Sequence, residues 1–275
     1  GDDVYGMALL KEYRSYRGKT IAIHALASRE RIIESYEGAY DFLYLYNNGD
    51  KCWRQIQSMS VSALINKIGK LFDVRVVLPY LLVSLKDARP ELQIIKEELL
   101  GTPSLSVIQY PALSCDIVSI PDFDENCSRI VILNPYSQSM IDPRPSLFSK
   151  VAEFLSEKGY RVYTNVIGNQ KPVPGTVPLS CSLVEFFSIC QNVPMVIGVR
   201  SGLFDLCISA KARFCVFYTS FMNFAWRYPT PEALAKRFSL SEWNTNNVWE
   251  HVVSNDEESY LFFKKFYDSV EGLVK

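Results

Sequence analysis

The second half of the chain alternates short apolar runs with longer segments whose apolar residues recur at helical spacing. Short Val- and Ile-rich strands that alternate with helices are typical of an α/β fold built on a parallel sheet. The expected strands are 130–135, 160–166, 194–199 and 213–218, and the expected helices are 146–158, 181–191 and 203–210. The pattern therefore predicts an uninterrupted β-α-β-α-β-α-β series that begins at Ile130.

The first half shows the same alternation with weaker boundaries. The expected helices are 6–17, 28–36, 57–72 and 89–100, and the expected strands are 20–24, 40–47 and 74–79. Residues 119–129 are polar and contain a proline, which is typical of a connection between domains. We therefore expect one α/β domain over residues 1–125 and a second over residues 126–275. The aromatic-rich tail ends in a predicted helix over residues 258–274.

Composition narrows the classes of function. The chain has 275 residues, and 29 basic against 30 acidic side chains give a net charge of −1, which argues against a dedicated nucleic-acid binder. The two histidines, His24 and His251, are too far apart in sequence to indicate a histidine-rich metal site. Seven cysteines without a CxxC pair indicate buried, reduced thiols and a cytoplasmic protein. No apolar run reaches the ~18 residues that a membrane span needs.

The candidate binding residues follow the predicted strands, because ligands of such sheets bind at the carboxyl ends of the strands. They are Asn134, Ser137, Gln138, Arg144, Gly168, Asn169, Ser180, Ser182, Arg200, Ser201, Gly202 and Asp205. Four of these positions have a structural alternative. Arg200 could hold a phosphate or form a salt bridge with Asp205, and Ser182 with Glu185 forms a capping-box pattern. Gly168 and Asn169 could form a simple turn.

Two stretches resemble glycosyltransferase family 9, the bacterial lipopolysaccharide heptosyltransferases, which have two Rossmann-like domains (the GT-B architecture). The first is residues 1–46, with a Gly-Asp turn, a helix, a strand, a further helix and a strand. The second is residues 132–218, which include the Leu-x-Glu helix and a Ser-Gly turn after the last buried strand. The resemblance implies that residues 1–125 face the acceptor, that residues 126–275 bind a nucleotide sugar, and that the last helix crosses back toward the first domain.

The sequence departs from the family at its most recognisable turn. The family has Asp-Ser-Gly there, with a histidine three residues after the glycine, whereas this chain has Arg200-Ser201-Gly202 and Asp205. The charges of the pair are reversed but remain complementary. The family's lysine in the loop after the first donor-domain strand is absent, and Arg144 is the nearest cation. The family places a β-strand before the Gly-Asp turn, so the resemblance leads us to expect a first domain without its first strand here.

The resemblance implies a metal-independent, inverting transfer from a nucleotide-sugar donor to a saccharide or a lipid-linked saccharide, with no cofactor and no nucleic acid. Asp2 is then the expected base, with Asp3 as its local alternative, although Asp2 could equally serve as the acidic first turn of a helix. The acidic pair Asp122 and Asp124 is interpreted as an exposed turn rather than as a metal site. The protein is expected in the cytoplasm, with peripheral contact at the inner face of the membrane as an extension of that hypothesis.

Two other hypotheses remain open from the sequence. A nucleotide-sugar epimerase of the same architecture would need more acid and base residues than two histidines provide. A degenerate transferase that binds a sugar nucleotide or a protein without catalysis would account for the reversed charges at Arg200 and Asp205.

Overall fold

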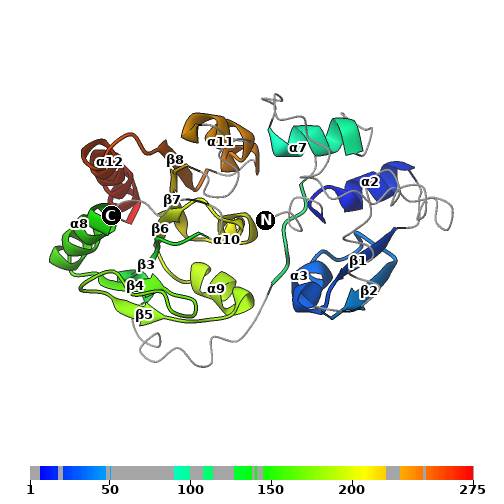
Figure 1. The fold of residues 1–275 in the computed structure, drawn as a ribbon, viewed down its shortest axis with the longest axis horizontal. Coiled ribbons are helices and arrows are strands. Elements are labelled where there is room, and N and C mark those ends of the chain that lie inside the picture. The colour runs from blue at the N-terminus through cyan, green and yellow to red at the C-terminus, as the bar shows by residue number, and fades with distance from the viewer. Residues whose placement is uncertain are drawn as a thin grey trace. The chain divides into compact units, whose positions relative to one another are not determined.

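The computed structural model describes residues 7–17, 21–47, 50, 90–99, 108–113, 127–137, 140, 145–220, 230–243 and 246–274. The chain divides into two compact units, Gly1–Leu113 and Ser114–Lys275 (Figure 1). The domain boundary expected at residues 125 and 126 lies outside the described residues and stays a prediction, as do the elements expected at 57–72 and 74–79.

The first unit contains a two-stranded parallel sheet with helices beside it. Its described elements are α2 (Leu10–Arg17), β1 (Ala22–Leu26), α3 (Glu30–Glu34), β2 (Phe42–Tyr46) and α7 (Glu91–Ile94), which continues as a π-helical turn over Ile95–Leu99. β1 and β2 pair from Ala22 with Phe42 to Leu26 with Tyr46. The side chain of Asp41 stabilises the start of the β1–β2 pair. It accepts a hydrogen bond from the Ile21 N–H (2.8 Å) and forms an ion pair with Arg14.

The second unit is built on a six-stranded sheet in which each neighbouring pair is parallel. Its strands are β3 (Ile130–Asn134), β4 (Arg161–Asn165), β5 (Val177–Leu179), β6 (Met195–Val199), β7 (Arg213–Tyr218) and β8 (Val248–Val252). Their order across the sheet is β5-β4-β3-β6-β7-β8. The four strands expected from the sequence are confirmed. They form the centre of the sheet, where every residue of β3 and β6 is buried.

The sequence pattern missed β5 and β8 because both are edge strands. β5 contains Pro178, a residue that is more typical of loops than of strands. A proline is tolerated at an edge because one side of the strand needs no backbone donor. β8 carries Glu250 and His251 within five residues that are only half-buried, so it lacks the apolar run of a central strand.

Helices cover both faces of this sheet (Figure 1). Figure 1 shows α8 (Pro145–Glu157) and α12 (Asp256–Val274) beside each other on one face. The other face carries α9 (Leu183–Cys190), α10 (Gly202–Cys207) and α11 (Pro231–Arg237). This distribution is what right-handed crossovers produce when the strand order reverses once.

α12 is fastened to α8 by aromatic side chains. The ring of Phe154 on α8 meets the rings of Phe263 and Tyr267 edge to face, with centroids 5.6 and 5.0 Å apart. Phe263 and Phe266 are fully buried, so the aromatic face of α12 belongs to the core of this unit. The crossing of this helix toward the first domain stays a prediction.

Three of the cysteines are buried in this unit. Cys190, Cys207 and Cys215 are each 0% exposed, and burial raises the pKa of the Cys190 and Cys215 thiols well above the ordinary value. The thiols of Cys190 and Cys215 therefore stay protonated, and all three cysteines are buried packing residues, as the sequence indicated. Cys127 and Cys181 are half-buried, and Cys52 and Cys115 lie outside the described residues.

The two central strands approach each other most closely where β3 ends. Gly198 of β6 pairs with Asn134 of β3, and a Cβ at position 198 would lie 2.3 Å from the Asn134 carbonyl oxygen and 2.8 Å from the Asn134 Cβ. Real Cβ atoms do not approach so closely, and the nearest obstructing atom is a backbone carbonyl oxygen, which cannot turn aside as a flexible side chain can. The glycine is therefore what allows the Asn134 side chain to occupy the end of β3.

We predict that Gly198→Ala lowers the free energy of unfolding by about 1–3 kcal/mol or more, because overpacking forces two central strands apart. Chemical denaturation monitored by far-ultraviolet circular dichroism measures this. Gly159→Ala is the control: its φ is +79°, but the described part of the chain has no atom within 4 Å of the added Cβ. Its cost should be limited to about 1–2 kcal/mol of backbone strain. A Gly198→Ala protein as stable as wild type would contradict the prediction.

Candidate binding site at the carboxyl edge of the six-stranded sheet

The strand order reverses between β3 and β6, so the connections from these two strands leave in opposite directions. In open α/β sheets this reversal opens a crevice at the carboxyl ends of the strands, where ligands bind. Asn134 is the last residue of β3, and Ser201 follows β6 by two residues. The sequence had singled out both.

A line of three polar side chains crosses this edge. The Nδ2 of Asn165, the last residue of β4, donates to the Oδ1 of Asn134 at 2.8 Å. The Nδ2 of Asn134 in turn donates to the Oγ of Ser201 at a longer 3.4 Å. Asn134 and Asn165 are 3% and 6% exposed, whereas Ser201 is half-buried. The line thus runs from a buried amide to the hydroxyl of a half-buried residue.

The sequence analysis missed Asn165, although a signal was present. Asn165 ends a buried strand, as Asn134 does, and polar residues in that position of a parallel sheet face the ligand edge. Asn165 lies inside the predicted strand 160–166, and the candidates expected after that strand were Gly168 and Asn169.

The remaining predicted residues are distributed as follows. Gly168 has a φ of +60° and forms a turn with the exposed Asn169, in which the Ile167 N–H donates to the Gln170 side chain. Ser180 is exposed just after β5, and Ser137 is half-buried after β3. These residues follow three neighbouring strands at the same edge. Asp2, Asp3, Gln138 and Arg144 lie outside the described residues.

Ser182 takes the structural role that its spacing to Glu185 predicted. Its hydroxyl accepts from the Glu185 N–H at 3.3 Å, and its own N–H donates to the Glu185 carboxylate at 2.6 Å, so that both halves of a capping box are present at the start of α9. The carboxylate also adds negative charge at this helix start. The start of α9 is therefore a poor place for a phosphate, and Ser182 contributes to the edge by fixing where the helix begins.

Arg200 lies inside the protein rather than at its surface. Its guanidinium forms two bonds to the Asp205 carboxylate, at 2.5 and 3.1 Å, and the two side chains are 4% and 2% exposed. Its Nε donates to the Phe238 carbonyl at 3.0 Å, and one terminal nitrogen donates to the Ser201 carbonyl at 2.6 Å. This geometry favours the salt bridge over the phosphate contact as the role of Arg200.

The Phe238 carbonyl connects Arg200 to a second buried group of charges and dipoles. The Tyr218 hydroxyl lies 2.8 Å from this carbonyl and 2.5 Å from the Glu250 carboxylate. The same carboxylate accepts from the Leu240 N–H at 2.7 Å and from the Ser239 hydroxyl at 2.8 Å. These hydrogen bonds hold the segment after α11 against the end of β7. Because Arg200 donates to the same segment, they also help to hold the turn after β6 in place.

The one described histidine side chain belongs to packing. The ring of His251 stacks on Phe262 with centroids 4.6 Å apart, and burial lowers the pKa of its imidazole while Glu258 partly offsets this. In the part of the chain that the structure describes, no three His, Cys, Asp or Glu side chains cluster in a way that could hold a metal ion. Among those residues, no helix is long and apolar enough to cross a membrane.

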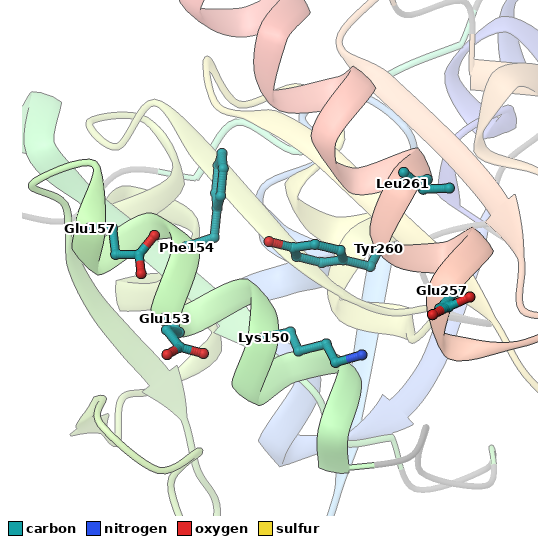
Figure 2. Close-up of a pocket in the computed structure, with 7 residues that line it drawn as sticks. All are labelled: Lys150, Glu153, Phe154, Glu157, Glu257, Tyr260 and Leu261. Carbon is teal, nitrogen blue, oxygen red and sulfur yellow. The ribbon is translucent and has the colours of Figure 1, made fainter.

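A groove between α8 and α12 is hollow but chemically unsuited to a nucleotide (Figure 2). Figure 2 shows Tyr260 between the two helices, and Phe154 and Leu261 also line the groove. Its charged lining is three glutamates and one lysine, namely Glu153, Glu157, Glu257 and Lys150. Burial and the carboxylates of Glu157 and Glu153 raise the pKa of the Tyr260 hydroxyl. A net negative lining repels a diphosphate, so the carboxyl edge remains the candidate site.

The buried ion pair leads to a stability prediction. Asp205→Ala leaves the Arg200 charge without its partner in the interior, and Arg200→Ala does the same to Asp205, so each variant should lose about 3–5 kcal/mol of unfolding free energy. Arg14→Ala is the control, because it breaks the partly exposed pair with Asp41 and should cost about 1 kcal/mol or less. Calorimetric melting of the three variants measures the difference.

The opposite outcome would return Arg200 to the ligand site. An Arg200→Ala protein that melts like wild type but binds nucleoside diphosphates more weakly would show that the guanidinium serves a phosphate instead of Asp205.

The chain is similar to known proteins in its structure and not in its sequence. No protein-family model matches the chain, and no curated protein sequence matches it significantly. A glycosyltransferase of family 9 from Veillonella parvula superposes with a TM-score of 0.55 at 12% identity, over 97% of this chain and 86% of that one. The ADP-heptose lipopolysaccharide heptosyltransferase II of Escherichia coli superposes with a TM-score of 0.58 at 10% identity, over 98% and 96%.

The E. coli heptosyltransferase WaaC, in its structure with ADP, superposes with a TM-score of 0.57 at 12% identity, over 98% of this chain and 96% of that one. These likenesses extend over nearly the whole chain at identities too low for sequence comparison to detect. The resemblance to glycosyltransferase family 9 that the sequence motifs carried is thus confirmed at the level of structure, and the chain has the α/β fold of the heptosyltransferases.

Proposed function

We propose that this chain is a glycosyltransferase of the GT-B architecture, with two Rossmann-like domains, that transfers a sugar from a nucleotide-sugar donor. The observation that carries the proposal is the polar line of Asn165, Asn134 and Ser201 at the point where the strand order reverses. Solved structures of similar fold were determined with ADP and with an ADP-heptose analogue. A nucleoside diphosphate sugar is therefore the class of ligand that we assign to this edge.

In the proposed donor site, the second unit binds the diphosphate with neutral hydrogen-bond donors. The Ser201 hydroxyl is the best placed of these, because it accepts from Asn134 and keeps its own proton for a ligand. Gly202 follows it and permits close approach of the ligand to the backbone. Ser137, Gly168, Asn169 and Ser180 form the remainder of the rim, and Arg200 with Asp205 supports the turn from inside. Gln138 and Arg144 belong to the same proposed site by their place in the sequence.

The proposed chemistry is metal-independent and inverts the anomeric centre. Asp2, or else Asp3, takes the proton of the acceptor hydroxyl, and the oxygen attacks the anomeric carbon opposite the leaving diphosphate. The C–O bond to the diphosphate breaks as the new bond forms. The growing negative charge is stabilised by donors that are already oriented, so little reorganisation is needed in the transition state.

The proposed acceptor is a bacterial polysaccharide or lipopolysaccharide, and the proposed location is the cytoplasm at the inner face of the membrane. Both follow from the kind of proteins that share the fold, one of which is a lipopolysaccharide heptosyltransferase. An alternative function is a non-catalytic module that binds a sugar nucleotide. The burial of Arg200 supports this alternative, because a structural ion pair then stands where the family has its acidic turn.

Binding of the nucleotide tests the proposed donor site. We expect wild-type protein to bind at least one of ADP, UDP, GDP and CDP in isothermal calorimetry, and Ser201→Ala to bind it about 10- to 100-fold more weakly, since a hydrogen bond to a charged group contributes about 1.5–3 kcal/mol. Ser156→Ala, an exposed change on α8, should bind like wild type. Equal affinities of wild type and Ser201→Ala would remove this hydroxyl from the site.

Transfer tests the catalytic residue and separates enzyme from binder. With a matching nucleotide sugar and a lipopolysaccharide core acceptor, Asp2→Asn should lower the release of nucleoside diphosphate about 10²- to 10⁴-fold, because a general base is lost. Donor affinity should stay within about twofold of wild type. If Asp3→Asn alone abolishes turnover, the base is Asp3. Tight donor binding by wild type without any acceptor-dependent turnover would support the non-catalytic alternative.

A further inference from the structure

Asn165 is the starting point, because its side chain is the first donor in the line of hydrogen bonds that runs through Asn134 to Ser201. Its Nδ2 donates to Asn134 at 2.8 Å from a position that is 6% exposed. In this arrangement its side-chain amide donates to Asn134 and is not itself the proposed contact with the ligand. Its effect on the site must therefore pass through Asn134 to Ser201.

The two ends of an amide side chain are chemically opposite, one a donor and the other an acceptor. Because Asn165 presents its NH₂ group, Asn134 must present its carbonyl oxygen, and the Asn134 NH₂ group then faces Ser201. Ser201 receives this donor on its oxygen and retains its own O–H proton. If the Asn134 amide were turned by 180°, it would accept that proton, and Ser201 would have none to offer a ligand.

The backbone at Asn134 cannot move to escape this choice. Gly198 lies against it so closely that the Asn134 carbonyl oxygen occupies the space of a missing Cβ. The side chain is 3% exposed, so water does not compete for its two ends. A turned Asn134 amide would oppose its NH₂ group to that of Asn165, and two facing donors in a buried site cost about 1–3 kcal/mol.

We propose that Asn165 is a positioning residue that orients Asn134 so that the Ser201 hydroxyl donates to a phosphate oxygen of the nucleotide-sugar donor. This inference rests on the proposed function and adds to it the residue that sets the polarity of the site. At Ser201, anion preference then comes from the direction of a neutral hydrogen-bond line and not from the guanidinium of Arg200. That is consistent with a guanidinium at position 200 that is committed to Asp205.

The test compares substitutions that keep or reverse this direction in the full chain, with the nucleoside diphosphate that binds tightest among ADP, UDP, GDP and CDP. Asn165→Leu removes the orienting donor and should weaken binding about 2- to 10-fold, as expected for one neutral hydrogen bond. Asn165→Asp presents an acceptor instead, turns the Asn134 amide and adds a negative charge, so its loss should reach or exceed that of Ser201→Ala. At acidic pH the introduced carboxyl regains a proton to donate, and the loss relative to wild type at the same pH should shrink.

Thr164→Val is the matched control on the same strand. It removes buried hydrogen bonds to the Thr176 hydroxyl (2.6 Å) and from the Val173 N–H (3.1 Å), and so lowers the melting temperature without touching the line. Nucleotide affinity should remain that of wild type. If Thr164→Val weakens binding as much as Asn165→Leu does, loss of local stability explains both, and the positioning role is overturned.

A double-mutant cycle isolates the path through Ser201. In a Ser201→Ala background, Asn165→Leu should cause no further loss of affinity, because the hydroxyl that it orients is gone. Additive losses would show that Asn165 does not act through Ser201. Wild-type binding that is weakened by Ser201→Ala but unchanged by Asn165→Leu overturns the positioning role and leaves the proposed function standing. If wild type binds none of the four nucleotides, the proposed function fails, and this inference fails with it.

Discussion

A buried guanidinium keeps its charge in the protein interior, so its donors must find acceptors there, and this requirement at Arg200 organises the carboxyl side of the second unit. Asp205 supplies the countercharge, and the carbonyl of Phe238 supplies an acceptor from a segment almost forty residues further on. That carbonyl also meets Tyr218, whose hydroxyl lies on Glu250. Segments from two strands, a helix start and a loop are therefore tied to one charge. Loss of either partner would release all of them together.

This constraint also explains why the guanidinium of Arg200 does not serve as a cation at the candidate site. The turn after β6 is held from within, so Ser201 can face the strand ends without any side-chain cap of α10. Close packing between Gly198 and Asn134 then fixes the backbone position of Asn134. The amide side chains of Asn134 and Asn165 place oriented dipoles at the ends of their strands. An edge of this kind can favour an anion because oriented neutral donors need no further reorganisation when a ligand arrives.

The likeness to the heptosyltransferases lies in the fold, whereas the departure from the family's sequence pattern lies in one turn, at positions 200–205. The chain has the α/β fold of the heptosyltransferases at only 10–12% identity, since many apolar sequences fill the same core. The reversed charges at positions 200 and 205 preserve a pair of opposite sign while changing which member could face a ligand. A fold can therefore persist while the chemistry of one turn is rebuilt.

The sequence by itself determined the four central strands of the second unit, the helices between them and the capping box at Ser182, because each depends on local spacing. It also placed Asn134 and Ser201 at the strand ends. It could not decide between a phosphate and Asp205 as the partner of Arg200, nor find Asn165 or the edge strands. Those outcomes depend on which groups from distant segments share one buried volume, and only the tertiary structure brings Asn165, Asn134 and Ser201 within hydrogen-bonding distance.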